Sequence, residues 1–327
     1  MPDHPFRHTP AVGGARHALR AVGRVLALSA LPLCLAACTT WLPNAQLGSS
    51  STAVSAPGAK PVPQPETLWA LTTAQQLIQV RLDRPQVVLQ RRALSGLPEG
   101  EDIIGMDFRV ARGVLFALAR SGRLYTVDTT TGVAQAVAAP PLAQPLVGEA
   151  FGVDFNPAVD RVRVVSVTGQ NLRLHPDTGL MIDGNPKEPG VQPDAPLSYV
   201  QGDVNAGRPP AVTAVAYTYN QENEKITTLY GIDRVMGTLV RQGSVEGTQP
   251  VVSPDTGRLT TIGSLGTGAL LDAAFDISDV RNTALLATRT ATDPRTRLYV
   301  LDLKTGQPTL RGILADGKPI RGIAIEP

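Results

Sequence analysis

The sequence predicts an all-β domain that folds as a β-propeller, and three observations support this. A short strand pattern with small or apolar residues at its centre recurs along the chain. Each of the first four copies is followed by two further strand patterns separated by Gly-, Asp- and Asn-rich turns, which is typical of antiparallel sheets. No window longer than about ten residues carries an uninterrupted 3.6-residue apolar period, so long helices are not expected.

The recurring pattern is the inner strand of a propeller blade. Its copies are 103–109 (IIGMDFR), 150–156 (AFGVDFN), 212–218 (VTAVAYT), 270–276 (LLDAAFD) and 320–326 (IRGIAIE). Successive copies begin between 47 and 62 residues apart, a normal spacing for a four-stranded blade. We predict five blades, with six as the alternative.

Closure of the ring follows from the two ends of the repeat. Strand-like residues 68–82 open the domain with no inner strand before them, whereas the copy at 320–326 has no strands after it. We expect the C-terminal strand to complete the first blade, because a closed ring leaves no exposed sheet edge.

The N-terminal residues predict a lipoprotein signal. Four arginines precede the apolar run 25–37, which is too short to span a bilayer as a helix, and the run ends in LAAC at residues 35–38. We therefore expect a signal peptide at 1–37, a lipidated Cys38, a flexible linker at 38–65 and the propeller at 66–327. A soluble signal with a chance cysteine is the alternative. Thr39 follows the cysteine, so outer-membrane sorting is expected in a Gram-negative cell.

Composition excludes several classes of function. After residue 37 the chain carries 26 basic and 27 acidic residues, which gives no electrostatic footprint for nucleic acid and leaves the lipid as the predicted membrane contact. Both cysteines, Cys34 and Cys38, and all histidines except His175 lie at or before residue 38. A zinc site built from several histidines or cysteines is therefore excluded. The few aromatic residues disfavour sugar and single-stranded nucleic-acid sites.

Acidic residues near the inner strands are the candidate chemical site. They are Glu101, Asp107, Glu149, Asp154, Asp272 and Asp276. Converging carboxylates could hold a cation such as Ca²⁺, which takes six to eight oxygen ligands, or could perform acid–base hydrolysis. The structural alternative is that they cap turns and pair with arginines; in particular, Asp160 could pair with an arginine of its own blade.

Residues 150–179 also resemble a known family. The pattern G-V-D-F-N-P, then D-R-V-R, then G-Q-N-L-R is similar to the bacterial domain of unknown function 4394, a family with propeller-like repeats. The resemblance spans about Glu66 to the C-terminus, supports the fold and a secreted location, and implies no assigned activity. It marks Gly152, Asp154, Phe155, Asn156, Pro157, Asp160, Arg161, Arg163, Gly169, Gln170, Asn171 and Arg173. Val167 stands where an acidic or amide residue is expected, which weakens the case for a metal-binding loop.

These observations favour a lipid-anchored propeller of the cell envelope that acts as a binding module rather than an enzyme. Its partner would be an envelope protein or a small ligand at one mouth of the central channel. The alternative is a carboxylate- or Ca²⁺-dependent hydrolase of the lactonase, phytase or glycosidase type. An enzyme would require at least three of the six acidic residues to converge in an open pocket.

Overall fold

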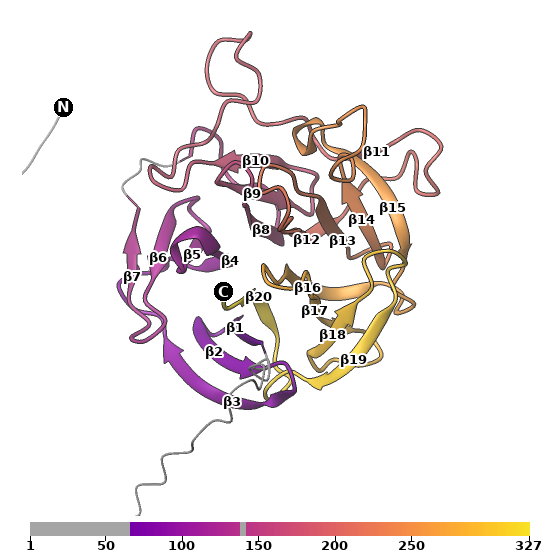
Figure 1. The fold of residues 1–327 in the computed structure, drawn as a ribbon. Coiled ribbons are helices and arrows are strands. Elements are labelled where there is room, and N and C mark those ends of the chain that lie inside the picture. Colours follow the sequence, from indigo (N-terminus) through magenta and orange to yellow (C-terminus); the bar gives the residue numbers. More distant parts are fainter. Residues whose placement is uncertain (1–65, 138–141) are drawn as a thin grey trace, which may run out of the picture. The chain divides into compact units, whose positions relative to one another are not determined.

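A computed structural model describes residues 66–137 and 142–327, and these form a five-bladed β-propeller (Figure 1). The predictions of an all-β fold and of five blades are confirmed. The predicted signal peptide at 1–37, Cys38 and the predicted linker at 38–65 lie outside the described residues. Within the described residues, no helix is long and apolar enough to cross a membrane.

Five inner strands surround the central axis, and each packs against the inner strand of the next blade. The inner strands are β4 (Ile103–Arg109), β8 (Phe151–Asn156), β12 (Val212–Tyr217), β16 (Leu270–Ile277) and β20 (Ile320–Ile325). The strands that follow outward are β1 (Thr67–Thr72), β5 (Val114–Ala119), β9 (Arg161–Ser166), β13 (Leu229–Asp233) and β17 (Ala284–Thr290). The third strands are β2 (Gln76–Arg81), β6 (Leu124–Val127), β10 (Asn171–Leu174), β14 (Thr238–Gln242) and β18 (Arg297–Leu301). The outer strands are β3 (Arg84–Ala93), β7 (Ala134–Ala136), β15 (Arg258–Ser264) and β19 (Pro308–Ile313).

The C-terminal strand closes the ring as predicted. Strand β20 pairs antiparallel with β1, so that Ala70 faces Ile323 and Leu68 faces Ile325. The first blade therefore has the strand order β20-β1-β2-β3 and is assembled from both ends of the domain. Figure 1 shows the yellow C-terminal strand beside the indigo first strands.

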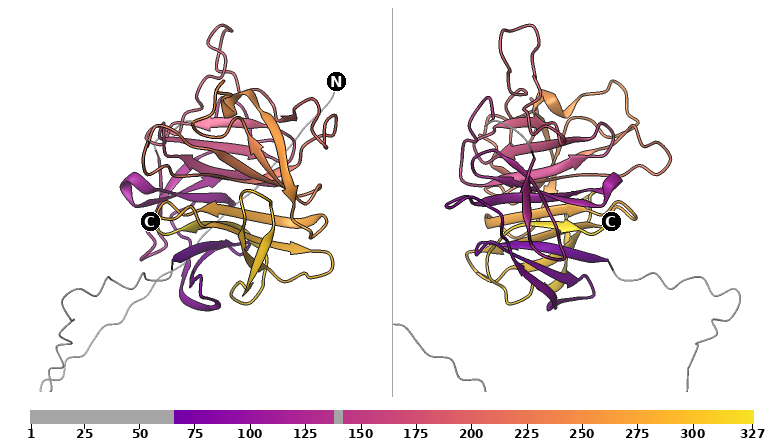
Figure 2. Two further views of the ribbon diagram at one scale, coloured as in Figure 1. Left: turned by 45° about the vertical axis from the view of Figure 1, so that its right-hand side comes forward. Right: turned by 90° about the vertical axis from the view of Figure 1, so that its left-hand side faces the viewer.

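Two blades depart from the expected four strands. The blade of β8 has three strands, and the segment after β10 instead crosses to the next blade. There β11 (Ser198–Tyr199) pairs parallel with β15 and gives that blade a fifth strand. The loop between β10 and β11 projects from the ring in Figures 1 and 2. The sequence did not predict that β11 joins the next blade, because the segment before β11 is rich in proline and glycine and carries no strand pattern.

Small residues let the inner strands approach one another at the axis. The narrow part of the channel is lined by one glycine or alanine from each inner strand at the same level: Gly105, Gly152, Ala214, Ala274 and Gly322. A Cβ added at Gly152 would lie 2.8 Å from the backbone N of Val215, and one added at Gly105 would lie 2.4 Å from Val153 Cγ2. A side chain at Gly152 would therefore crowd the axis. The space left along the axis here is about 20 Å³.

Candidate functional site

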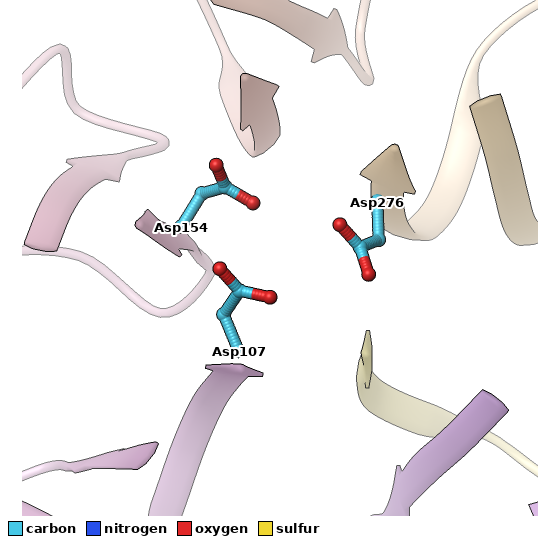
Figure 3. Close-up of side chains that lie close together, drawn as sticks. All are labelled: Asp107, Asp154 and Asp276. Atoms are coloured by element: carbon cyan, nitrogen blue, oxygen red, sulfur yellow. The ribbon is translucent and has the colours of Figure 1, made fainter. Parts of the chain in front are cut away.

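Three aspartates converge at one end of the central channel (Figure 3). Asp107, Asp154 and Asp276 lie near the ends of β4, β8 and β16, and one carboxylate oxygen from each lies within 4.8 Å of the others. All three side chains are buried. Alanine, Ala216 or Ala324, stands at the matching position of the other two inner strands.

The aspartates accept backbone N–H groups from all five inner strands. Asp107 accepts the N–H of Phe108 at 2.8 Å and that of Phe155, in the next blade, at 2.7 Å. Asp276 does the same for Ile277 and for Ile325, both at 2.6 Å.

Asp154 differs from the other two, because its Oδ2 accepts a single N–H, that of Tyr217, at 2.9 Å. The N–H of Phe155, the residue that follows Asp154, donates to Asp107 instead. Five of the six carboxylate oxygens each accept one of the five N–H groups, and the sixth, Asp154 Oδ1, accepts none of them.

Burial and mutual repulsion favour protonation within this cluster. Burial, together with the neighbouring aspartates, raises the pKa of Asp107 and of Asp154 well above the usual range. Burial raises the pKa of Asp276 to about 6. Both oxygens of Asp107 and both of Asp276 accept a backbone N–H, whereas Asp154 Oδ1 accepts none of the five. A proton shared within the cluster is therefore best held on Asp154, where it displaces none of these hydrogen bonds.

This donor set suits a structural role better than a cation site. Ca²⁺ requires six to eight oxygen ligands at 2.3–2.6 Å. Here the positive ends of five backbone N–H groups already point at the carboxylates. A cation would have to bind against those dipoles, whereas a shared proton needs no further ligand.

The other three acidic candidates lie away from this cluster, toward the end where the inner strands begin. Glu101 accepts the Ser121 hydroxyl at 2.6 Å. Glu149 accepts Arg234 Nη2 at 2.7 Å, and Asp272 accepts Arg289 Nε at 2.7 Å. The structure thus brings together three of the six acidic residues and distributes the others among polar partners.

A cavity of about 220 Å³ opens at this second end of the channel, which we call the entry mouth. All five blades contribute to its lining, which consists of Thr73, Ile104, Glu149–Phe151, Thr213, Arg234, Leu271–Ala273, Arg289 and Pro319–Arg321. It shares Phe151, Thr213, Ala273 and Arg321 with the narrow part of the channel, so the two are continuous.

A second cavity, of about 230 Å³, lies at the aspartate end. Its lining includes Ala111, Phe155, Asn156, Tyr219 and Ile226. This lining is more apolar than that of the entry mouth and carries a single arginine, Arg109. The two ends of the channel therefore differ sharply in chemistry.

Two residues of the entry mouth, Glu149 and Asp272, were among the predicted acidic candidates, whereas Thr213 and the three arginines were missed. A signal was present for two of these. The second position of the inner-strand repeat is apolar at Ile104 and Phe151 but polar at Thr213 and Arg321, and both polar residues line the entry mouth.

The family-motif residues are mainly structural. Asn156 Oδ1 accepts the N–H of Ala158, and Gly169 has a left-handed φ of 84° in a turn that begins at Ser166. Gln170 bonds the backbone of Pro145 and Val147. Asn171 bonds Ala195 and Pro254, which fastens the crossing segment. Of the remaining motif positions, Pro157 lines the cavity at the aspartate end and the Arg161 side chain bonds backbone carbonyls.

The prediction that Asp160 pairs within its own blade is wrong. Its Oδ1 accepts Arg109 Nε of the preceding blade at 2.8 Å, and Arg109 also binds Asp177. Arg163 is turned the other way and pairs with buried Asp194 at 2.5 Å and with Asp255 at 2.6 Å. Asp160 lies in the turn before β9 with a φ of 52°, whereas Arg163 lies within the strand, and the two side chains connect to different neighbouring blades instead of to each other.

A known family matches most of the propeller. Residues 76–324 match the family described as Domain of unknown function (DUF4394). No curated protein matches the chain. Among solved structures, a chain of the crystal structure of a nidogen/laminin complex is similar with a TM-score of 0.42 and 11% identity, over 81% of this chain and 99% of that chain.

Proposed function

Since the chain belongs to the DUF4394 family, a domain of unknown function, we propose its role from the geometry: a lipid-anchored binding module of the cell envelope that holds a small ligand at the entry mouth. The anchor is proposed from the arginine-rich leader and the LAAC sequence that ends at Cys38. The proposed location is the outer membrane if the cell is Gram-negative.

The observation that carries this proposal is a cavity of about 220 Å³ to whose lining all five blades contribute. Charged groups from three different blades, Arg234, Arg289 and Arg321, meet there around buried polar and apolar groups. Small-ligand sites combine such concavity with a few convergent polar groups. A volume of about 220 Å³ suits a small molecule better than a protein segment.

A carboxylate-dependent hydrolase is less well supported. The three convergent aspartates are buried and accept N–H groups that join neighbouring blades. A catalytic acid or base must lie within hydrogen-bond reach of the substrate proton that it transfers. The carboxylates that do face the entry mouth, Glu149 and Asp272, each pair with an arginine.

Thermal denaturation of the full chain in the presence of a small-molecule extract of the producing cell's envelope tests the proposal. A ligand that binds the folded state alone raises the melting temperature. Leu271 lines the entry mouth and is 45% exposed, so Leu271→Trp should obstruct the cavity and abolish the shift. Leu310 on outer strand β19 is 49% exposed, and Leu310→Trp is the matched control that should retain it. An equal shift in both variants would refute the proposal.

A further inference from the structure

We infer that the ligand at the entry mouth carries an oxyanion group, a carboxylate or a phosphate, bound by Arg234, Arg289 and Arg321 with the hydroxyl of Thr213. This inference rests on the proposed function and specifies the ligand class. Its basis is a set of hydrogen-bond donors that have no acceptor among residues 66–137 and 142–327.

Each of the three guanidinium groups engages its acidic partner through one nitrogen. Arg234 uses Nη2 toward Glu149, Arg289 uses Nε toward Asp272, and Arg321 Nη2 lies 2.8 Å from Asp102 Oδ2. A guanidinium has five N–H donors in a planar fork that matches a carboxylate or phosphate in bidentate geometry. Among the described residues, the remaining nitrogens of these arginines have no acidic partner.

Two buried polar atoms at the mouth also have no partner among the described residues. They are Arg321 Nε and Thr213 Oγ1, and Thr213 is only 2% exposed. Burial of a polar group without a hydrogen bond costs folding free energy, so native proteins rarely retain one without a reason. Both residues lie where the cavity joins the narrow channel, which places the bound oxyanion at the floor of the cavity.

The charge balance of the lining favours an anion. Three arginines and two carboxylates, those of Glu149 and Asp272, line the cavity, and Asp102, the partner of Arg321, lies outside the lining. The Glu149 side chain is 76% exposed, and such exposed ion pairs contribute little stability. An incoming anion can therefore displace Glu149 from Arg234 at small cost.

Calorimetric titration of the full chain with inorganic phosphate, citrate and glucose at constant ionic strength tests this inference. Saturable binding of phosphate or citrate, with none of glucose, is expected, and the tighter anion identifies the head group. Arg289→Gln and Thr213→Val should each weaken binding of that anion at least tenfold. Thr213→Val preserves the shape of the side chain, so it tests the hydroxyl even where Arg289→Gln misfolds. Arg295→Gln, on an exposed arginine paired with Asp293 outside the mouth, is the control and should leave binding unchanged.

Three results would overturn the inference. One is binding of neither anion, and another is equal weakening by Arg295→Gln. The third is an envelope ligand that is uncharged and yet blocked by Leu271→Trp, in which case the proposed function stands and the ligand class is wrong. If no ligand in the extract binds either, both proposals fail.

Discussion

Replacement by asparagine should change the stability of the domain in opposite directions at two of the channel aspartates, Asp107 and Asp154. Asp107 accepts two backbone N–H groups, those of Phe108 and Phe155, through both of its oxygens. Asparagine offers one carbonyl oxygen, so Asp107→Asn leaves one buried N–H facing an NH₂ group. An unsatisfied buried donor costs about 1–3 kcal/mol, and we expect a loss of that size.

Asp154→Asn should instead stabilise the domain. Asp154 accepts only the N–H of Tyr217, which the asparagine carbonyl oxygen retains. The NH₂ group then takes the place of the proton on Asp154 and donates to Asp107 without any need for protonation. A hydrogen bond to a charged group contributes about 1.5–3 kcal/mol, and we expect a net gain of about 1–2 kcal/mol.

Urea and thermal denaturation at pH 7.5 measure both effects. For a domain of this size, 1 kcal/mol corresponds to a change of about 2–4 °C in melting temperature. The gain from Asp154→Asn should shrink at pH 4, where the carboxyl of wild-type Asp154 is protonated at little cost. If Asp154→Asn destabilises the protein as much as Asp107→Asn, the assignment of the shared proton to Asp154 is wrong.

Three further predictions address the cluster and the anchor. Burial raises the pKa of Asp276 from 3.8 to about 6, so the unfolded state loses its proton first and stability falls as the pH rises between these values. From pH 4 to pH 7, wild type should therefore lose about 2 kcal/mol relative to Asp276→Asn in urea denaturation, and a constant difference would contradict the raised pKa. Millimolar Ca²⁺ should leave the melting temperature equal to that in EDTA, whereas an upward shift of several degrees would show that the aspartates hold a cation. Cys38→Ala should abolish incorporation of a labelled fatty acid and release the protein from membranes, and Cys34→Ala, its matched control, should do neither.

The propeller could be predicted because all five inner strands must meet the same physical requirement. Each strand passes close to the axis, so each repeat carries glycine or alanine at the same position, as at Gly105 and Gly322. Closure by β20 followed from the lone C-terminal repeat. The addition of β11 to the next blade could not be predicted, because it depends on tertiary contacts such as those of Asn171 with Ala195 and Pro254.

The candidate site was harder to predict because register decides which side chains meet. The repeat taken to begin at Leu270 in fact begins at Asp272, since β16 carries an irregularity between these residues. This two-residue shift places Asp276 at the level of Asp107 and Asp154, and moves Asp272 to the opposite end of the channel. Six acidic residues that look alike in sequence therefore occupy two separate environments.

Ligand should bind at the entry mouth and not at the aspartate end of the channel. The native cysteines lie at positions 34 and 38, so an introduced cysteine in the propeller is a unique reporter there. Leu271→Cys would report on the entry mouth and Ala111→Cys on the cavity at the aspartate end. Alkylation rates, read by peptide mass spectrometry with and without the bound anion, provide the measurement. We expect protection of Leu271→Cys alone; protection confined to Ala111→Cys would contradict the account.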